Sequence, residues 1–167
     1  MRNIALFLCI LLLLSVCIGC SAKQDNFEQP VNFYYCKKDI SYHSVSGVIA
    51  PEIRDGAGFH GNLSAFMHAY LRGPESAYLQ TWIPSDVYLV SCEVADAELN
   101  LVFSSQFAKL SGVKLTTVCS AILLSLHDYT GIQILNISAK DTQLDEKDVL
   151  RFSMDDVILI DTVTIDE

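Results

Sequence analysis

The strongest local pattern in the sequence is an apolar stripe between Leu115 and Leu126. Its members follow the i, i+3, i+4 spacing of one helical face: Leu115, Val118, Cys119, Ile122, Leu123 and Leu126. Gly131 comes after the stripe and can end the helix, because glycine adopts the left-handed conformation without strain. A stripe this continuous needs an apolar surface opposite it, so we expect the helix to pack on a sheet.

The strands of that sheet are predicted from alternation and composition. Residues 87–94 and 97–103 alternate with a period of two, and the short link between them predicts an antiparallel hairpin with one buried face and one face at least partly in water. Residues 31–36 are predicted to form the first strand and residues 41–50 the second. Residues 51–61 contain three glycines and a proline, so we expect a connection there.

The remaining elements complete an α+β domain. Residues 63–71 are predicted to form a helix that Asn62 caps and that the Arg-Gly-Pro sequence at 72–74 ends. Further strands are expected at 132–138 and, after a charged turn or short helix, at 157–160. The order ββαββαβ favours a two-layer sandwich: a mostly antiparallel sheet with two helices on one face.

An apolar run precedes this domain. Residues 4–18 have no charge, and Arg2 lies before them. A membrane span needs about 20 apolar residues, so this run has the length of a secretory signal. A retained anchor helix is the alternative.

The end of that run resembles the lipobox of bacterial lipoproteins. Gly19 precedes Cys20, and a polar segment follows, although the usual leucine is replaced by Cys17. The resemblance implies a signal peptide at 1–19, lipidation of Cys20 and a polar tether at 20–30. We therefore expect the mature protein on the outer face of the cell membrane, held by its lipid chains.

The charge of the chain is strongly acidic and unevenly placed. The formal net charge is −9, and residues 141–167 hold nine acids against Lys147 and Arg151. Such a chain is a poor partner for nucleic acid or anionic lipid headgroups, whose phosphates attract lysine and arginine side chains. We expect residues 141–167 to be a C-terminal extension packed on the domain. Its acids form either a solvated edge or a docking surface for a basic partner.

No arrangement of reactive side chains indicates catalysis. The cysteines after the signal lack the spacing of a disulfide framework or a metal site, and we expect buried thiols, with one disulfide as the alternative: Cys36, Cys92 and Cys119. The histidines show no metal-ligand spacing: His43, His60, His68 and His127. The pair His127-Asp128 lies near the expected end of a helix, where the helix dipole favours a histidine, so this explanation is preferred to acid–base chemistry. Ser104 follows a predicted strand, where its hydroxyl can bond to backbone groups. We expect no cofactor, no metal and no enzymatic activity.

Several motifs together resemble the GerMN domain of sporulation and spore germination proteins. They are YLRGP at 70–74, TWIP at 81–84, LVFSSQFAKLSG at 101–112 and GIQILNI at 131–137, and the similarity covers residues 31–140. The resemblance assigns structural or interface roles to these residues: Leu71, Gly73, Pro74, Ile83, Pro84, Phe103, Ser104, Phe107, Leu110, Gly112 and Gly131. The family's Asp-Gly hairpin turn is Asp96-Ala97 here, which predicts a changed turn type because alanine resists positive φ.

The resemblance implies a non-catalytic assembly or interaction role outside the cytoplasmic membrane, in sporulation or germination, with a protein of the envelope as partner. The alternative is a ligand-binding lipoprotein or an unrecognised enzyme. Its pocket would lie near residues 55–61 and His60, whereas a flat surface there would count against it.

Overall fold

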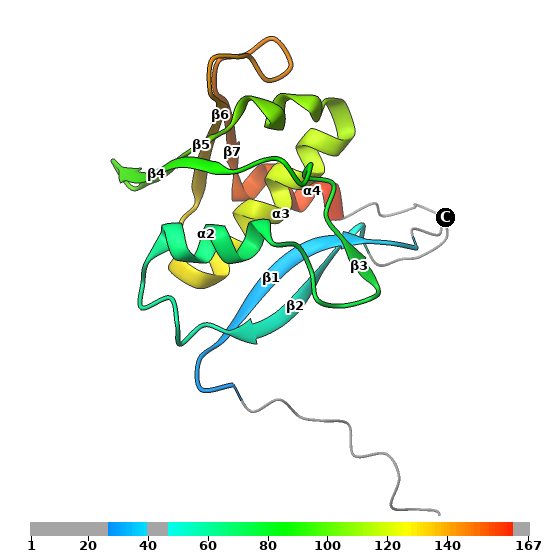
Figure 1. Ribbon diagram of the computed structural model, residues 1–167, viewed down its shortest axis with the longest axis vertical. Helices are drawn as coiled ribbons and strands as arrows, with labels where there is room; N and C mark the ends of the chain where they lie inside the picture. Colours follow the sequence, from blue (N-terminus) through cyan, green and yellow to red (C-terminus); the bar gives the residue numbers. More distant parts are fainter. Residues whose placement is uncertain (1–26, 40–46, 162–167) are drawn as a thin grey trace, which may run out of the picture.

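The part of the chain that the structure describes folds into two β-sheets with helices packed against both (Figure 1). A computed structural model describes residues 27–39 and 47–161. The three-stranded sheet has the order β2-β1-β3: β1 is Pro30–Lys37, β2 Ile49–Asp55 and β3 Leu79–Gln80. The four-stranded sheet has the order β4-β5-β6-β7: β4 is Leu89–Ala95, β5 Glu98–Phe103, β6 Ile134–Ala139 and β7 Leu150–Ser153. The helices are α2 Leu63–Leu71, α3 Gly112–Thr130, α4 Met154–Asp161 and the 3-10 helix η2 Ser105–Lys109.

The predicted α+β sandwich is confirmed, but its strands form two sheets where one was expected. β1 pairs along its length with β2, whereas it meets β3 only at Cys36 and Lys37. Over the rest of β1, helix α3 occupies the place of the next strand. The Tyr34 N–H donates to Ser125 Oγ of α3 at 2.8 Å. A backbone donor satisfied by a helix side chain cannot pair with a strand, so the sheet stops there.

Strand β2 corrects the expected connection at 51–61. The strand begins at Ile49 and continues through Pro51 to Asp55, and residues 40–46 of the predicted second strand lie outside the described residues. Residue pairs between β1 and β2 alternate between hydrogen-bonded and non-hydrogen-bonded positions. The pairs Lys37–Val48 and Gln29–Gly56 are hydrogen-bonded, so the alternation makes Tyr34–Pro51 a non-hydrogen-bonded pair. Proline, which lacks an N–H, is therefore tolerated on this edge strand.

Both predicted helices are confirmed, together with their end signals. The Ala65 N–H donates to Asn62 Oδ1 at 3.0 Å at the start of α2, and Gly73 has φ 82° just after its end. Gly131 has φ 78° after α3. Both glycines lie in the left-handed region, where a side chain would strain the backbone.

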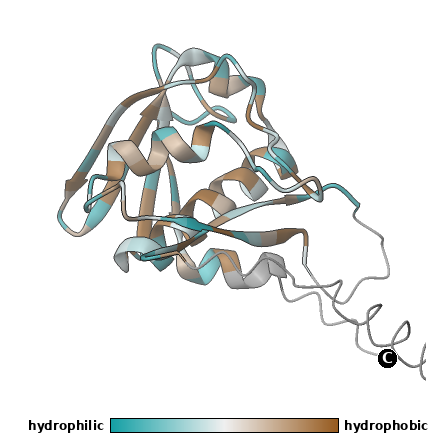
Figure 2. Ribbon diagram, turned by 60° about the horizontal axis from the view of Figure 1, so that its bottom comes forward, coloured by the Kyte–Doolittle hydropathy of each residue, from teal (hydrophilic) through white to brown (hydrophobic). Residues whose placement is uncertain are grey.

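The four-stranded sheet has one buried and one wet face, as the alternation predicts. Strand β5 pairs antiparallel with β4 and parallel with β6, and α3 makes the crossover between β5 and β6. Residues that face the helices are almost fully buried: Leu99, Leu101, Phe103, Leu135 and Ile137. The opposite face carries a cross-strand row of polar residues that includes Asn100, Asn136 and Arg151. Figure 2 shows the hydrophobic residues concentrated on the strands and the central helices.

The C-terminal part departs from the prediction. Residues 157–160 lie in helix α4, not in a strand, and the last strand of the described residues is β7 at 150–153, beside β6. Asp156 Oδ2 accepts the Ser153 N–H at 2.7 Å, and the Asp156 N–H faces Ser153 Oγ at 3.4 Å. This reciprocal cap starts a helix, which outweighs the strand preference of the following Val-Ile-Leu-Ile sequence.

The hairpin turn also differs from expectation. Asp96 and Ala97 have φ of 53° and 64°, and they lie between the paired residues Ala95 and Glu98. Two central residues with positive φ define the type I′ turn, so the turn type that favours Asp-Gly is kept with alanine in the glycine position. The twist of the two strands holds Ala97 in a conformation that alanine alone would avoid.

Candidate interaction surface

The residues highlighted by the family motifs lie mainly in the core and at the ends of elements. Phe103 and Phe107 stack with their ring centroids 4.5 Å apart, and Ile83 and Leu110 are buried near them in the same core. Ser104 Oγ accepts the Tyr88 N–H at 3.2 Å, as expected for a serine at a strand end.

The motif residues near the helix ends fix the backbone conformation of turns and of the helix start. Leu71 and Pro74 are half-buried and flank the turn at Gly73, and Pro84 accepts the Val87 N–H at 3.0 Å in the turn before β4. Gly112 starts α3 with φ 53°, and its N–H donates to Asp145 Oδ2 at 2.9 Å. These contacts make the motif residues supports for the fold.

A buried ion pair that the sequence reading missed lies under the end of α2. Arg54 Nε donates to Glu52 Oε1 at 2.6 Å, and their side chains are only 11% and 10% exposed. Arg54 Nη2 also donates to the Gly73 carbonyl at 2.7 Å, and its guanidinium lies 4.9 Å from the Phe33 ring centroid. The sequence predicts a connection at 51–61, and a connection has no strand alternation that would place Glu52 and Arg54 on the same inner face.

The same network lines a depression near the site of the expected pocket. Its volume is about 580 Å³, and Glu52, Arg54, Arg72 and Phe59 contribute to its wall. The Glu52 carboxylate already accepts the N–H groups of Glu75 and Ser76, in addition to Arg54. The most buried charges there are thus engaged in holding the chain together.

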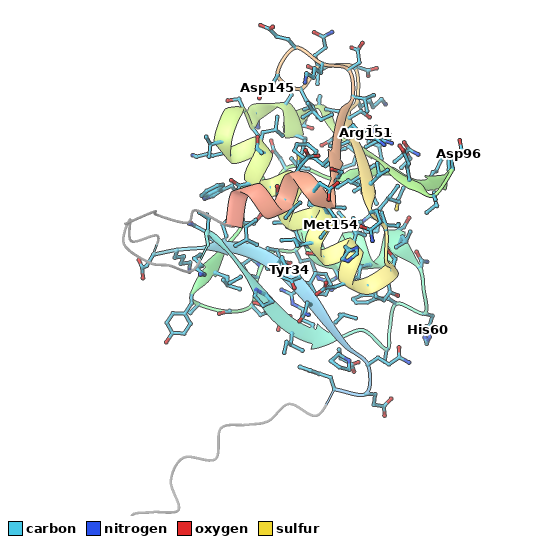
Figure 3. The ribbon with its side chains drawn as sticks, turned by 180° about the vertical axis from the view of Figure 1, so that it is seen from behind. Tyr34, His60, Asp96, Asp145, Arg151 and Met154 are labelled. Carbon is cyan, nitrogen blue, oxygen red and sulfur yellow. The ribbon has the colours of Figure 1, made fainter. Side chains whose placement is uncertain are left out.

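His43 lies outside the described residues, and the other three histidines do not converge on that depression or on each other. His60, with φ 47°, lies at the margin of the molecule and points outward (Figure 3), and His68 is exposed on α2. His127 Nδ1 lies 3.0 Å from the Ile132 carbonyl, whereas Asp128 accepts hydrogen bonds from Asn32 and Tyr34. His127 and Asp128 therefore serve different contacts. Within residues 27–39 and 47–161, no three histidine, cysteine or acidic side chains gather as metal ligands do.

The three cysteines of the described part are free thiols. Burial raises the pKa of Cys36 to about 11 and also raises that of Cys119 and Cys92. Protonated thiols are poor nucleophiles, so none resembles an activated cysteine. Cys92 is the one that is partly exposed, on β4 beside Ser64 of α2.

The most distinctive surface of the domain is the β4 edge, which we define as residues 88–94. Tyr88, Val90 and Val94 are 57%, 44% and 55% exposed, and in the described part of the chain no strand pairs with the outer side of β4. The hairpin projects from the body with Asp96 at its tip (Figure 3). A register shift between Leu89 and Ser91 interrupts the alternation.

Among the described strands, none pairs with the outward-facing backbone groups of the β4 edge. The pair that closes a two-residue turn is hydrogen-bonded, and bonded and non-bonded pairs then alternate. Ala95, Glu93 and Ser91 accordingly bond to β5, while Cys92 and Val94 direct their N–H and C=O groups outward. Such an edge can accept another strand.

Comparisons with known proteins place the fold. No family model and no curated protein matches the sequence. The structure is similar to a candidate lipoprotein from Clostridium perfringens, with 16% identity, a TM-score of 0.51, and coverage of 80% of this chain and 92% of the other. It is also similar to the tandem GerMN domains of the sporulation protein GerM from Bacillus subtilis, with 20% identity, a TM-score of 0.52 and coverage of 68% of this chain.

The chain spans 39% of the length of that tandem structure. The domain thus has a GerMN-like fold. The predicted signal peptide and Cys20 lie outside the described residues. In the part that is described, no helix has both the length and the apolar character of a membrane span.

Proposed function

We propose that this protein is a lipid-anchored lipoprotein of the cell envelope and that its domain is a non-catalytic interaction module used in sporulation or germination. The observation that carries the proposal is the GerMN-like fold behind a lipobox-like sequence. The similarity to the Clostridium perfringens candidate lipoprotein supports the anchor. The exposed β4 edge supplies a surface for partners.

The anchor is tested at the two cysteines of the leader. Cys20→Ser should abolish labelling by a fatty-acid probe and move the protein from the membrane to the soluble fraction, because the acylated thiol is gone. Cys17→Ser is the matched control and should retain labelling. Equal labelling of the Cys20→Ser protein would refute the anchor.

The interaction surface is tested with a photo-crosslinking amino acid at two exposed tyrosines. Tyr88 lies on the β4 edge and is 57% exposed, whereas Tyr78 lies off that edge and is 83% exposed. In sporulating cells we expect defined crosslinked products from position 88 and none, or different ones, from position 78. Identical products from both positions would show that β4 is not a specific contact surface.

The biological setting is tested by expression and deletion. We expect the gene to be induced during sporulation and its deletion to lower the yield or germination of spores. Equal expression in growth and sporulation, with normal spores from the deletion strain, would remove the sporulation assignment and leave the anchor intact.

A further inference from the structure

We propose that the lipid anchor holds the domain upright on the membrane, with the loop at 56–61 beside the lipid headgroups and the acidic loop at 141–148 facing away from them. This inference rests on the acylation of Cys20 proposed above and adds the surface that meets the membrane. The argument uses the reach of the tether, the length of α3 and the charges of the two loops.

The start of the described chain lies beside the loop at 56–61. The Gly56 N–H donates to the Gln29 carbonyl at 2.7 Å. Phe27, the first described residue, lines the same depression as Phe59. The chain that leads back to the anchor therefore leaves the domain next to this loop.

Helix α3 joins the two loops and sets their separation. Near its C-terminal end, the Tyr129 hydroxyl accepts the Gly61 N–H at 2.9 Å. At its N-terminal end, the Gly112 N–H donates to Asp145 Oδ2 at 2.9 Å. A helix of 19 residues rises about 27 Å from its first residue to its last. Figure 1 shows the loop that joins β6 and β7 at one end of the domain and the start of β1 at the other.

The tether is too short for the inverted orientation. Cys20 precedes Phe27 by seven residues, and a fully extended chain of that length spans at most about 25 Å. Inversion would put the loop at 141–148 on the membrane and hold Phe27 at least about 27 Å above it. A chain stretched to its limit also loses conformational entropy, which adds to the cost of that orientation.

Charge favours the upright orientation over one in which the domain lies flat. The loop at 56–61 contains no acidic residue, and the acids that flank it are Glu28 and Asp55. The loop at 141–148 has four acids against Lys147: Asp141, Asp145, Glu146 and Asp148. Anionic headgroups repel such acids within about 8 Å at physiological ionic strength. The upright domain carries the acidic loop out of this layer, whereas a flat domain would keep it there.

The test places a fluorophore on either loop of the full acylated chain in vesicles of phosphatidylcholine and phosphatidylglycerol. Ala57→Cys and Gln143→Cys leave the charge unchanged, and both are labelled in a Cys92→Ser background because Cys92 is the partly exposed thiol of the described residues. Headgroups that carry a nitroxide quench only nearby fluorophores. We expect quenching at position 143 to be about fivefold weaker than at position 57, because that loop lies about 27 Å farther from the headgroups.

A longer tether checks whether its length causes the orientation. An insertion of about twelve glycine and serine residues after Asn26 lets the chain between Cys20 and Phe27 reach about 65 Å. Quenching at position 57 should then fall at least about twofold, because the loop is no longer held near the membrane. Unchanged quenching at position 57 would show that tether length does not set the orientation and would overturn the argument from reach.

The outcomes separate the orientation from the anchor. Equal quenching at positions 57 and 143, or stronger quenching at 143, overturns the upright orientation, while release of the Cys20→Ser protein would still support the anchor. The labelled Cys20→Ser chain is the control and should show no quenching at either position. If the wild-type and Cys20→Ser chains partition alike, the anchor is wrong and the orientation is refuted with it.

Discussion

Ala97 offers a sharp test of the hairpin geometry. Its φ of 64° lies in the left-handed region, at the second central position of a type I′ turn. A non-glycine residue held there costs about 1 to 2 kcal/mol. Glycine removes that cost but adds freedom to the unfolded chain, which offsets about 0.5 to 1 kcal/mol. The net expectation for Ala97→Gly is a stabilisation of about 0.5 to 1 kcal/mol.

The measurement is urea unfolding of a soluble form that starts at Ser21, followed by circular dichroism. Ala97→Gly should raise the urea midpoint with an unchanged slope, because the folded surface does not change. Ala95→Gly is the control: this neighbour lies in β4 without a positive φ, so glycine there should destabilise by about 0.5 to 1 kcal/mol. A lower midpoint for Ala97→Gly would refute the type I′ assignment.

Three further predictions concern buried and capping charges. Arg54→Met should destabilise by about 3 to 5 kcal/mol, because it leaves the buried Glu52 carboxylate without its opposite charge and the Gly73 carbonyl without its donor. Arg54→Lys should recover little of this loss, because lysine lacks the planar fork of the guanidinium; urea midpoints check both variants. Asp145→Ala should cost about 1 kcal/mol by removing the acceptor at the start of α3, measured by helix content and midpoint. Hydrogen bonds from the Ser153 backbone and hydroxyl lower the pKa of Asp156, so the stabilisation from its carboxylate is present above the unfolded pKa near 3.8 and is lost as pH falls through the folded pKa. Asp156→Ala should therefore flatten the acid side of the stability profile.

The failures of sequence reading share a physical cause. The strand at 49–55 was not predicted, because Pro51 and the three glycines that follow it at 56–61 indicated a connection. Pro51 is tolerated because it lies on an edge, and the charges of Glu52 and Arg54 because they satisfy each other and backbone groups across the fold. The apolar run at 157–160 predicted a strand. The helix found there begins at a cap formed by the side chains of Ser153 and Asp156, and hydrophobic periodicity does not reveal such a cap.

The candidate surface was only partly visible in the sequence. The alternation of residues 88–94 indicated a strand with apolar side chains, but not that Tyr88, Val90 and Val94 would stay exposed. Exposure depends on strand order, and strand order depends on long-range pairing, which local patterns do not encode. The family-motif residues were visible because the motifs that contain them resemble those of a known family.

The sequence by itself determined the two amphipathic helices with their ends, the β4–β5 hairpin and the acidic balance, because caps, glycines and periodicity act over a few residues. Only the tertiary structure decided that the strands form two sheets, that Arg54 joins β2 to the end of α2, and that β4 lies at an open edge. These features arise from contacts between residues far apart in the chain. The free energy of these contacts depends on how much apolar surface they bury and on which backbone groups the complete fold leaves without a hydrogen-bond partner.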